Sequence, residues 1–218
     1  MEKRTMQRGV LMLPKTEIMK VDVDWVAIKN ECRNTVNKEF TDGEPSEKFK
    51  KDILKSEHSP IRLAQFRFRW AGIKSWVSVH FARHWLGWDK WISTQRDDRT
   101  GEDRDSARQD TPVNMDVNAN VQALINVARY RLCQGCAHPQ TRAHMVSLKF
   151  AIKDAGQKEI SDVLVPNCVY RCGCPEINPC PFFNTFTKIA NDEYVNLLDI
   201  QQRYDLYNRL LEKTERGK

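Results

Sequence analysis

Residues 64–72 read AQFRFRWAG, and their apolar and polar side chains alternate. The apolar side chains fall on one face of an extended chain: Ala64, Phe66, Phe68 and Trp70. A period of two that is rich in aromatic residues is typical of a strand buried on one face only. The sequence therefore predicts a sheet with one covered face, and the strand is expected at residues 61–71.

The segments around this strand read mainly as helices. Apolar residues at helical spacing, bounded by turn residues, predict the following helices: residues 21–37, 47–56, 75–85, 118–132, 141–154 and 191–213. An edge strand is expected at residues 10–13, and loops at residues 41–46, 97–110 and 163–180. We expect an α/β (α+β) fold, with an antiparallel or mixed sheet flanked by helices. The expected organisation is one domain over residues 1–218, with a Cys-rich segment at 133–180 and a C-terminal helix at 191–213.

The composition excludes several classes of protein. The chain has 218 residues, of which 40% are apolar and 29% charged, so it can build a core and is not a disordered chain. It contains no run of about 18 apolar residues, which a membrane-spanning helix would need. The N-terminal residues lack the apolar core of a signal peptide, so we expect a cytoplasmic protein without a membrane partner.

The net charge of +6 is concentrated in one window, residues 61–96. This window holds five of the six tryptophans, seven basic side chains and one acid, Asp89. Arginine beside tryptophan suits phosphate pairing and the stacking of flat rings. The same pattern also fits an amphipathic element whose tryptophans lie in the core, so both interpretations stay open.

Several short motifs follow one another in a fixed order. His58-Ser59-Pro60 precedes the strand, and Arg83-His84-Trp85 follows it. Next come STQR at residues 93–96, TPVN at residues 111–114, and a helix that carries Asn120, Leu124, Asn126 and Arg131. HPQ follows this helix at residues 138–140.

This order resembles the flavin-dependent thymidylate synthase family over about residues 50–150. That family has H-E-S-P-x-E-H-x-x-F-x-F, then R-H-R closely followed by a serine and an arginine, then L-P-L-N, N-x-R-S-L-x-N-x-x-x-x-R and H-A-Q. The resemblance implies an enzyme that moves a one-carbon unit from methylenetetrahydrofolate to C5 of dUMP. It implies FAD reduced by NADPH, and a homotetramer or other homo-oligomer with sites shared between subunits.

The resemblance also implies roles for individual residues. Arg83, His84, Asn120, Asn126 and Ser59 would bind the flavin. A further set would bind the nucleotide: Ser93, Thr94, Gln95, Arg96 and Arg131. Arg131 is the catalytic candidate, because its charge would stabilise negative charge on the uracil ring. The alternatives are surface charges for Arg83 and Arg131, a structural histidine for His84, and a helix-surface residue for Asn126.

Asn120 and Arg131 are eleven residues apart, so in one helix they would share a face, whereas Asn126 would point elsewhere.

The sequence departs from the family pattern at several positions. The second histidine of H-E-S-P-x-E-H falls at Leu63 and its glutamate at Arg62, while the third residue of R-H-R is Trp85. Gln122 stands where the family has arginine. We therefore expect a divergent member with an altered pocket for nucleotide and folate.

Six of the seven cysteines fall in two clusters: Cys133 and Cys136 in the first, and Cys168, Cys172, Cys174 and Cys180 in the second. In a cytoplasmic chain, clustered cysteines favour a metal over disulfides, and four thiolates suit zinc. We expect a structural zinc held by Cys133, Cys136 and two cysteines of the second cluster. An iron–sulfur cluster, free thiols and disulfides are the alternatives.

Two further functions compete with the enzyme. A zinc-stabilised nucleic-acid-binding module would use the basic, Trp-rich window on bases and phosphates, although we expect no nucleic-acid partner. A related protein could instead bind nucleotide or flavin without turnover.

Overall fold

The strand predicted at residues 61–71 is β2 (Gln65–Lys74), and it is one of the two central strands of an antiparallel sheet. The computed structural model describes residues 13–217. The sheet has four strands in the order β1-β2-β4-β3, with β1 at Glu17–Asp22, β3 at Trp88–Ile92 and β4 at Pro112–Asn120. The expected α/β fold with a helix-flanked sheet is therefore confirmed.

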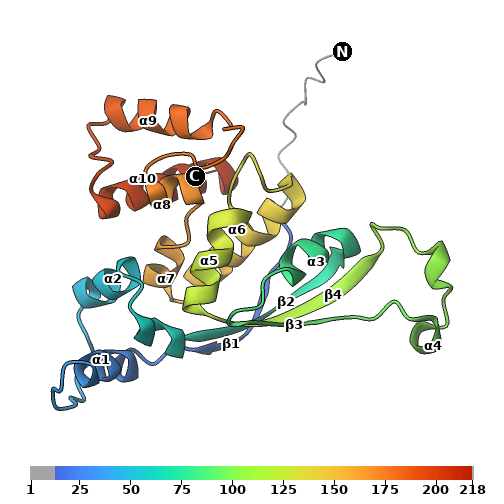
Figure 1. Cartoon of the computed structure of the whole chain (residues 1–218), viewed down its shortest axis with the longest axis horizontal. Coiled ribbons are helices and arrows are strands. Elements are labelled where there is room, and N and C mark those ends of the chain that lie inside the picture. Colours follow the sequence, from blue (N-terminus) through green and yellow to red (C-terminus); the bar gives the residue numbers. More distant parts are fainter. Residues whose placement is uncertain (1–12, 218) are drawn as a thin grey trace.

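The two faces of the sheet differ in chemistry. Phe66 pairs with Ala119, and Phe68 with Val117, and all four side chains are fully buried. On the opposite face, Arg69 of β2 makes a two-bond ion pair with Asp116 of β4, at 2.6 and 2.8 Å. Helices α3, α5 and α6 lie on the apolar side of the sheet (Figure 1). The alternation of apolar and polar residues in the sequence thus indicates which face of the sheet is covered by helices.

The helices also alternate with short turns along the chain. The first half holds α1 (Trp25–Asn34), α2 (Glu47–Lys55), α3 (Ser75–Ala82) and α4 (Asp97–Thr100). The second half holds α5 (Val121–Arg131), α6 (Pro139–Asp154), α7 (Lys158–Asp162), α8 (Asn167–Arg171), α9 (Phe182–Asp192) and α10 (Ile200–Glu215). Two 3₁₀ turns lie at Ser59–Leu63 and Arg104–Ser106.

Side-chain caps explain several of these boundaries. Asp24, Ser46, Asn120 and Asp199 each accept a hydrogen bond from a backbone N–H in the first turn of the helix that follows. Such a cap satisfies a donor that has no partner inside the helix. Helix α6 begins with Pro139, which needs no partner for a backbone N–H, and Nδ1 of His138 accepts from the backbone N–H of Gln140 at 3.3 Å.

Several of the predicted elements differ from the structure. The helix expected at 75–85 ends at Ala82, and residues 61–63 of the expected strand belong to a 3₁₀ turn. The helix expected at 21–37 is shorter, because residues 21 and 22 belong to β1. The helix expected at 118–132 loses its first residues to β4. The loop expected at 163–180 contains α8, and the loop expected at 97–110 contains α4 and a 3₁₀ turn. The single helix expected at 191–213 is wrong, since α9 ends at residue 192 and α10 begins at residue 200. The strand expected at 10–13 falls mostly outside the described residues.

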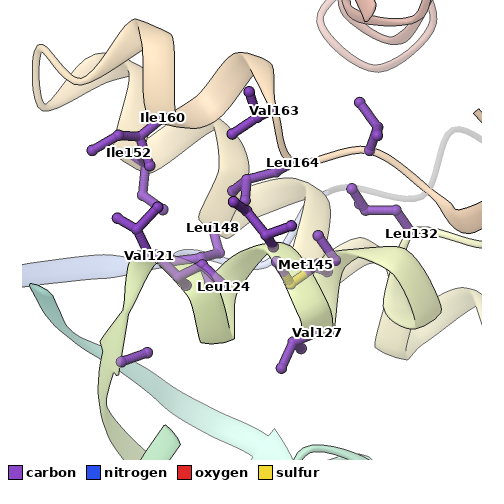
Figure 2. Packing of buried hydrophobic residues seen from close by; sticks show 14 of the residues in the cluster. Val121, Leu124, Val127, Leu132, Met145, Leu148, Ile152, Ile160, Val163 and Leu164 are labelled. Carbon is purple, nitrogen blue, oxygen red and sulfur yellow. The ribbon is translucent and has the colours of Figure 1, made fainter. Parts of the chain in front are cut away.

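The core continues from the sheet into the C-terminal helices. Val121 and Leu124 of α5 lie against Met145 and Leu148 of α6, and Ile160 of α7 lies against the same layer (Figure 2). The same hydrophobic cluster takes in buried residues of α8, α9 and α10. Helix α5 is therefore buried between the sheet and the C-terminal helices, which fixes the residues at both its ends.

Within residues 13–217, no helix is both long and apolar enough to cross a membrane.

Candidate functional site

Arg131 lies at the last residue of α5 and reaches across to the end of α3. Its Nε donates to Nε2 of His84 at 3.0 Å, and its Nη2 donates to the carbonyl oxygen of His80 at 2.6 Å. The last carbonyls of a helix lack partners within the helix, so the guanidinium completes the end of α3. The sequence-predicted residues Arg131 and His84 are thus in direct contact, although 47 positions separate them.

His84 is held in its neutral form. Burial first, and then the charges of Arg131, Lys90 and Arg83, lower its pKa from 6.5 to about 4. Since the guanidinium of Arg131 is permanently charged and can only donate, Nε2 of His84 accepts and the ring proton lies on Nδ1. At neutral pH the site therefore offers a cation beside an uncharged imidazole with an N–H group.

Trp88 and Lys90 of β3 position His84 from the other side. Nζ of Lys90 donates to the carbonyl oxygen of His84 at 2.7 Å. The ring of Trp88 is fully buried and meets the His84 ring edge to face, with centroids 6.2 Å apart. Nε1 of Trp88 is buried without a hydrogen-bond partner. Both residues fix the turn that links α3 to β3.

His80 forms a second layer behind Arg131. Its Nδ1 lies 2.8 Å from Oγ1 of Thr141, a fully buried residue in the first turn of α6. Burial and the nearby charge of Arg131 lower the pKa of His80 below its usual value. Sequence reasoning missed His80, Thr141 and Lys90. A signal for His80 existed, because His80 and His84 are four residues apart along an expected helix.

Arg83 lies beside this group and is exposed. Within the described residues, its guanidinium makes no ion pair or side-chain hydrogen bond, yet its charge contributes to the low pKa of His84. Next to it, Trp85 and Leu86 are about 70% exposed (71% and 68%). An unpaired cation and exposed apolar side chains thus lie together outside the Arg131–His84 contact.

Asn120 lies at the opposite end of α5 and serves as its N-cap. Its Oδ1 accepts from the backbone N–H of Ala123 at 2.9 Å, and its own N–H donates to the carbonyl oxygen of Gly87 at 3.0 Å. Asn120 is the last residue of β4, so it does not share a helix face with Arg131, contrary to the prediction.

Gly87 has a φ of +65°, and a Cβ there would lie 2.2 Å from Nδ2 of Asn120. The turn that carries His84 is therefore closed directly onto the start of α5.

Asn126 and Ser59 lie outside this group. Oδ1 of Asn126 accepts from Nη1 of Arg129 at 3.3 Å, and Arg129 forms an ion pair with Glu57. Nε2 of Gln122 also donates to Glu57, at 2.7 Å. Ser59 is exposed at the start of the first 3₁₀ turn. None of the hydrogen bonds described for the chain connects these residues to His84 or Arg131.

The expected phosphate-binding segment, residues 93–96, begins an extended arm. Oγ of Ser93 donates to the carbonyl oxygen of Asn114 at 3.3 Å, and the backbone N–H of Asn114 donates to Ser93 Oγ at 2.6 Å. Oγ1 of Thr94 accepts from the N–H of Arg96 at 3.1 Å. Oε1 of Gln95 accepts from Ser75, whereas its Nε2 is buried without a partner.

Arg96 itself is exposed and already paired. Its Nε and Nη2 donate to the two carboxylate oxygens of Asp98, at 2.9 and 2.8 Å. A shallow cavity of about 340 Å³ lies beside this pair and is lined by Arg96, Asp97, Asp98 and Arg104. Figure 1 shows the arm with α4 at the far end of the sheet, away from α5. The structure therefore does not bring Arg96 to Arg131 within one chain.

The basic window of residues 61–96 is likewise not one surface. Arg67 and Arg69 lie on the open face of the sheet, Lys90 contacts His84, and Arg96 lies on the arm. A concentration of charge in the sequence thus becomes several separate cations in the fold.

The grouping of the cysteines in space differs from their two clusters along the sequence. Cys133, Cys136, Cys168, Cys174 and Cys180 lie near the C-terminal end of α5. Sγ of Cys172 instead lies 3.5 Å from the carbonyl oxygen of Leu197, and Cys172 has a φ of +54°. The structure thus sets Cys172 apart from the other five.

No family model matches the sequence, and no curated protein is similar to it in sequence at a significant level. The fold, however, is similar to solved structures. A thymidylate synthase X from Helicobacter pylori, solved with FAD and dUMP, is 11% identical, with a TM-score of 0.56 over 69% of this chain and 98% of that chain. A second structure of the flavin-dependent thymidylate synthase ThyX from the same organism, also with FAD and dUMP, gives 10% identity and the same TM-score over 68% of this chain and 99% of that chain.

A UMP/dUMP methylase from Streptomyces cacaoi, bound with 5-Br dUMP, is 14% identical with a TM-score of 0.50 over 70% of this chain and 96% of that chain. The chain has the fold of the flavin-dependent thymidylate synthases.

Proposed function

We propose that the chain is a divergent flavin-dependent enzyme that transfers a one-carbon unit from methylenetetrahydrofolate to C5 of a pyrimidine nucleotide, with dUMP as the expected substrate. The observation that carries this proposal is the contact between Arg131 and His84 within that fold. Both residues match motif positions of the family, and the fold brings them together from different elements.

The residues around His84 fit a flavin nucleotide. Its phosphates need cations with free donors, and the guanidinium of Arg83 is exposed with no partner in the described residues. Its flat ring needs an aromatic or apolar surface, and Trp85 and Leu86 offer one beside Arg83. The N–H of His84 Nδ1 supplies a donor for a carbonyl edge. FAD would thus be held mainly by Arg83 and His84, with Asn120, Asn126 and Ser59 as further candidates from the resemblance.

Reduced FAD, with NADPH as the source of its electrons, supplies the reducing power that turns the transferred methylene into a methyl group. The role of this chain's own residues is to stabilise charge on the ligand. Arg131 is already oriented by two hydrogen bonds, so it can stabilise negative charge on a pyrimidine ring without being reorganised first. Because His84 is uncharged, the positive charges beside it are those of Arg131 and Arg83. An anionic ligand would pair with these two guanidinium groups.

Arg96, with Ser93, Thr94 and Gln95, is proposed to bind the nucleotide phosphate. Because the arm points away from α5, this phosphate site would serve the Arg131 of another copy of the chain. Exposed Trp85, Leu86 and Trp91 would then be covered by that copy. A homotetramer or other homo-oligomer is accordingly part of the proposal.

The test starts from the protein as purified. We expect a yellow protein that releases FAD, binds dUMP, and releases label from C5-tritiated dUMP when NADPH and methylenetetrahydrofolate are added. Arg131→Ala should abolish turnover while FAD stays bound, and Arg83→Ala should weaken FAD binding. Arg108→Ala is the matched control, since Arg108 is exposed on the arm and, among residues 13–217, forms its ion pair with Asp110.

Two other results would replace the proposal. FAD and dUMP binding without turnover would identify a non-catalytic relative. A colourless protein with salt-dependent binding of oligonucleotides would identify a nucleic-acid-binding module.

A further inference from the structure

Five cysteines gather where three separate parts of the chain meet. Cys133 and Cys136 follow the end of α5, Cys168 lies in α8, and Cys174 and Cys180 lie between α8 and α9. Cys168 is buried in α8, a helix that packs against α5. The fold thus brings together segments that carry Cys133, Cys136, Cys168 and Cys180, although up to 47 positions separate these residues along the sequence.

The turn at residues 133–136 has the geometry of a ligand loop. The backbone N–H of Cys136 points at Sγ of Cys133, at 3.4 Å. A Cβ on Gly135 would lie 2.9 Å from Cβ and 3.2 Å from Sγ of Cys180, so only glycine leaves room for that side chain. An N–H aimed at sulfur stabilises a thiolate, and the glycine lets a third cysteine approach the pair.

Donor atoms are already gathered at this turn. Sγ of Cys133, Sγ of Cys136 and a carboxylate oxygen of Glu176 all lie within 4.8 Å of one another. Cys168 is buried, and Cys180 lies over the turn, where a Cβ on Gly135 would meet its side chain. Soft sulfur donors select zinc or iron–sulfur clusters over calcium and magnesium. Four sulfur ligands with no open position are typical of a structural zinc site.

We propose that Cys133, Cys136, Cys168 and Cys180 bind one structural zinc ion, and that Cys172 takes no part. Such an ion joins the end of α5 to α8 and to the start of α9. Cys133 is two residues after Arg131, so the ion also fixes the end of the helix that places Arg131 against His84. The C-terminal helices are then attached to the sheet by a metal as well as by the hydrophobic core.

The first experiment measures metal in the full-length protein by elemental analysis, together with titration of free thiols. We expect one zinc ion per chain and four thiols that react only after a chelator is added. Replacement of zinc by cobalt should give the charge-transfer absorption of four thiolates. Iron with acid-labile sulfide would overturn the assignment of zinc. Absence of metal, with all thiols reactive or paired in disulfides, would overturn the site itself.

The second experiment identifies the ligands with single Cys→Ser variants. Cys133→Ser, Cys168→Ser and Cys180→Ser should lose most of the zinc, while Cys172→Ser and Cys174→Ser should keep it. Cys172→Ser is the matched control, because Cys172 belongs to the same sequence cluster but lies against Leu197. Zinc retained in Cys180→Ser and lost in Cys174→Ser would overturn the ligand set. If a ligand variant fails to fold, the cobalt spectrum of the unmodified protein still decides the number of thiolates.

Discussion

Arg131 and Arg96 are both arginines of the expected nucleotide site, but they lie in opposite structural environments. Arg131 is half-buried and donates to His80 of α3 and to His84, which follows the end of that helix. Arg96 is exposed at the start of a short helix on an arm, and its partner Asp98 is only two residues away. One side chain is fixed by the tertiary structure, whereas the other is held by its own local sequence.

The contrast separates two ways of meeting an anionic ligand. Arg131 is oriented before a ligand arrives, so it loses little conformational entropy on binding. Arg96 has to leave a carboxylate before it can hold a phosphate, and ion pairs between exposed groups are worth only about 0–1 kcal/mol. We therefore expect Arg131 to affect both stability and ligand binding, and Arg96 to affect ligand binding alone.

The largest expected effect is that of Arg131→Ala on the free energy of unfolding. The change leaves Nε2 of His84 and the carbonyl oxygen of His80 without their donor in a half-buried place, at a cost of about 1–3 kcal/mol. Arg96→Ala should cost less than about 0.5 kcal/mol, as surface changes usually do. Denaturant unfolding of both variants checks the prediction, and equal losses would contradict the contrast.

The next effect is the pH dependence that His84 gives to folding. Its pKa is about 6.5 unfolded and about 4 folded, so the unfolded chain binds more protons between these values. Stability then rises with pH through this window and is lost as the pH falls from 6.5 towards 4. After discounting for partial exposure we expect a loss of about 1–2 kcal/mol.

Unfolding curves measured from pH 7 to pH 4 should show this loss in the natural chain and a smaller one in His84→Gln. His80 and His144 also have lowered pKa values and act in the same direction, so the difference between the two proteins is the quantity to compare. Parallel curves would mean that the folded chain does not hold His84 neutral in this pH range.

A smaller effect is expected at the other end of α5. Asn120→Ala removes the N-cap and should cost about 1 kcal/mol of unfolding free energy. Asn120→Asp keeps a capping oxygen and should restore most of it. If Asn120 also binds the flavin through its amide, Asn120→Asp should still weaken FAD binding, which fluorescence titration measures. Normal FAD affinity in Asn120→Asp would assign Asn120 to capping alone.

The smallest expected effect is a gain in affinity for dUMP. Asp98→Asn frees Arg96 from its ion pair, so affinity for dUMP should rise about twofold to fivefold at low salt. This gain matches the free energy of one exposed ion pair. Calorimetric titration at low and high salt measures it, and the gain should disappear at high salt. The double variant Asp98→Asn with Arg96→Ala is the control, and it should show no gain.

The sequence predicts the central strand and most helices because their signals are local. The period of two predicts β2, and the helices expected at 47–56 and 141–154 correspond to α2 and α6, although Ser46 and Pro139 mark their starts in the structure. β4 carries the same alternating signal in its four buried residues: Val113, Met115, Val117 and Ala119. It was missed because Asn118 and Asn120 were assigned to the following helix.

The C-terminal region was predicted wrongly for a different reason. The apolar stripe from Leu197 to Leu211 keeps helical spacing, but its first member lies in the turn before α10. Asp199, which caps α10, was a local sign of the break.

The site depends on information that no local pattern holds. Arg131 and His84 were both named as candidates, but their contact across 47 positions follows only from how α3 and α5 cross the sheet. The same is true of Arg96, whose distance from Arg131 follows from the direction of the arm. Motif order therefore identifies candidate residues, while the fold decides which of them act together.

Gly87 and Asn120 have a consequence for how this chain can vary. The glycine has a left-handed backbone and leaves no space for a Cβ next to the asparagine amide. In a library randomised at residues 85–87 and selected for folded protein, glycine should be fixed at position 87, while the exposed positions 85 and 86 drift. Distant relatives should therefore keep this glycine–asparagine pair long after the surrounding charges have changed, which makes it a useful marker for finding them.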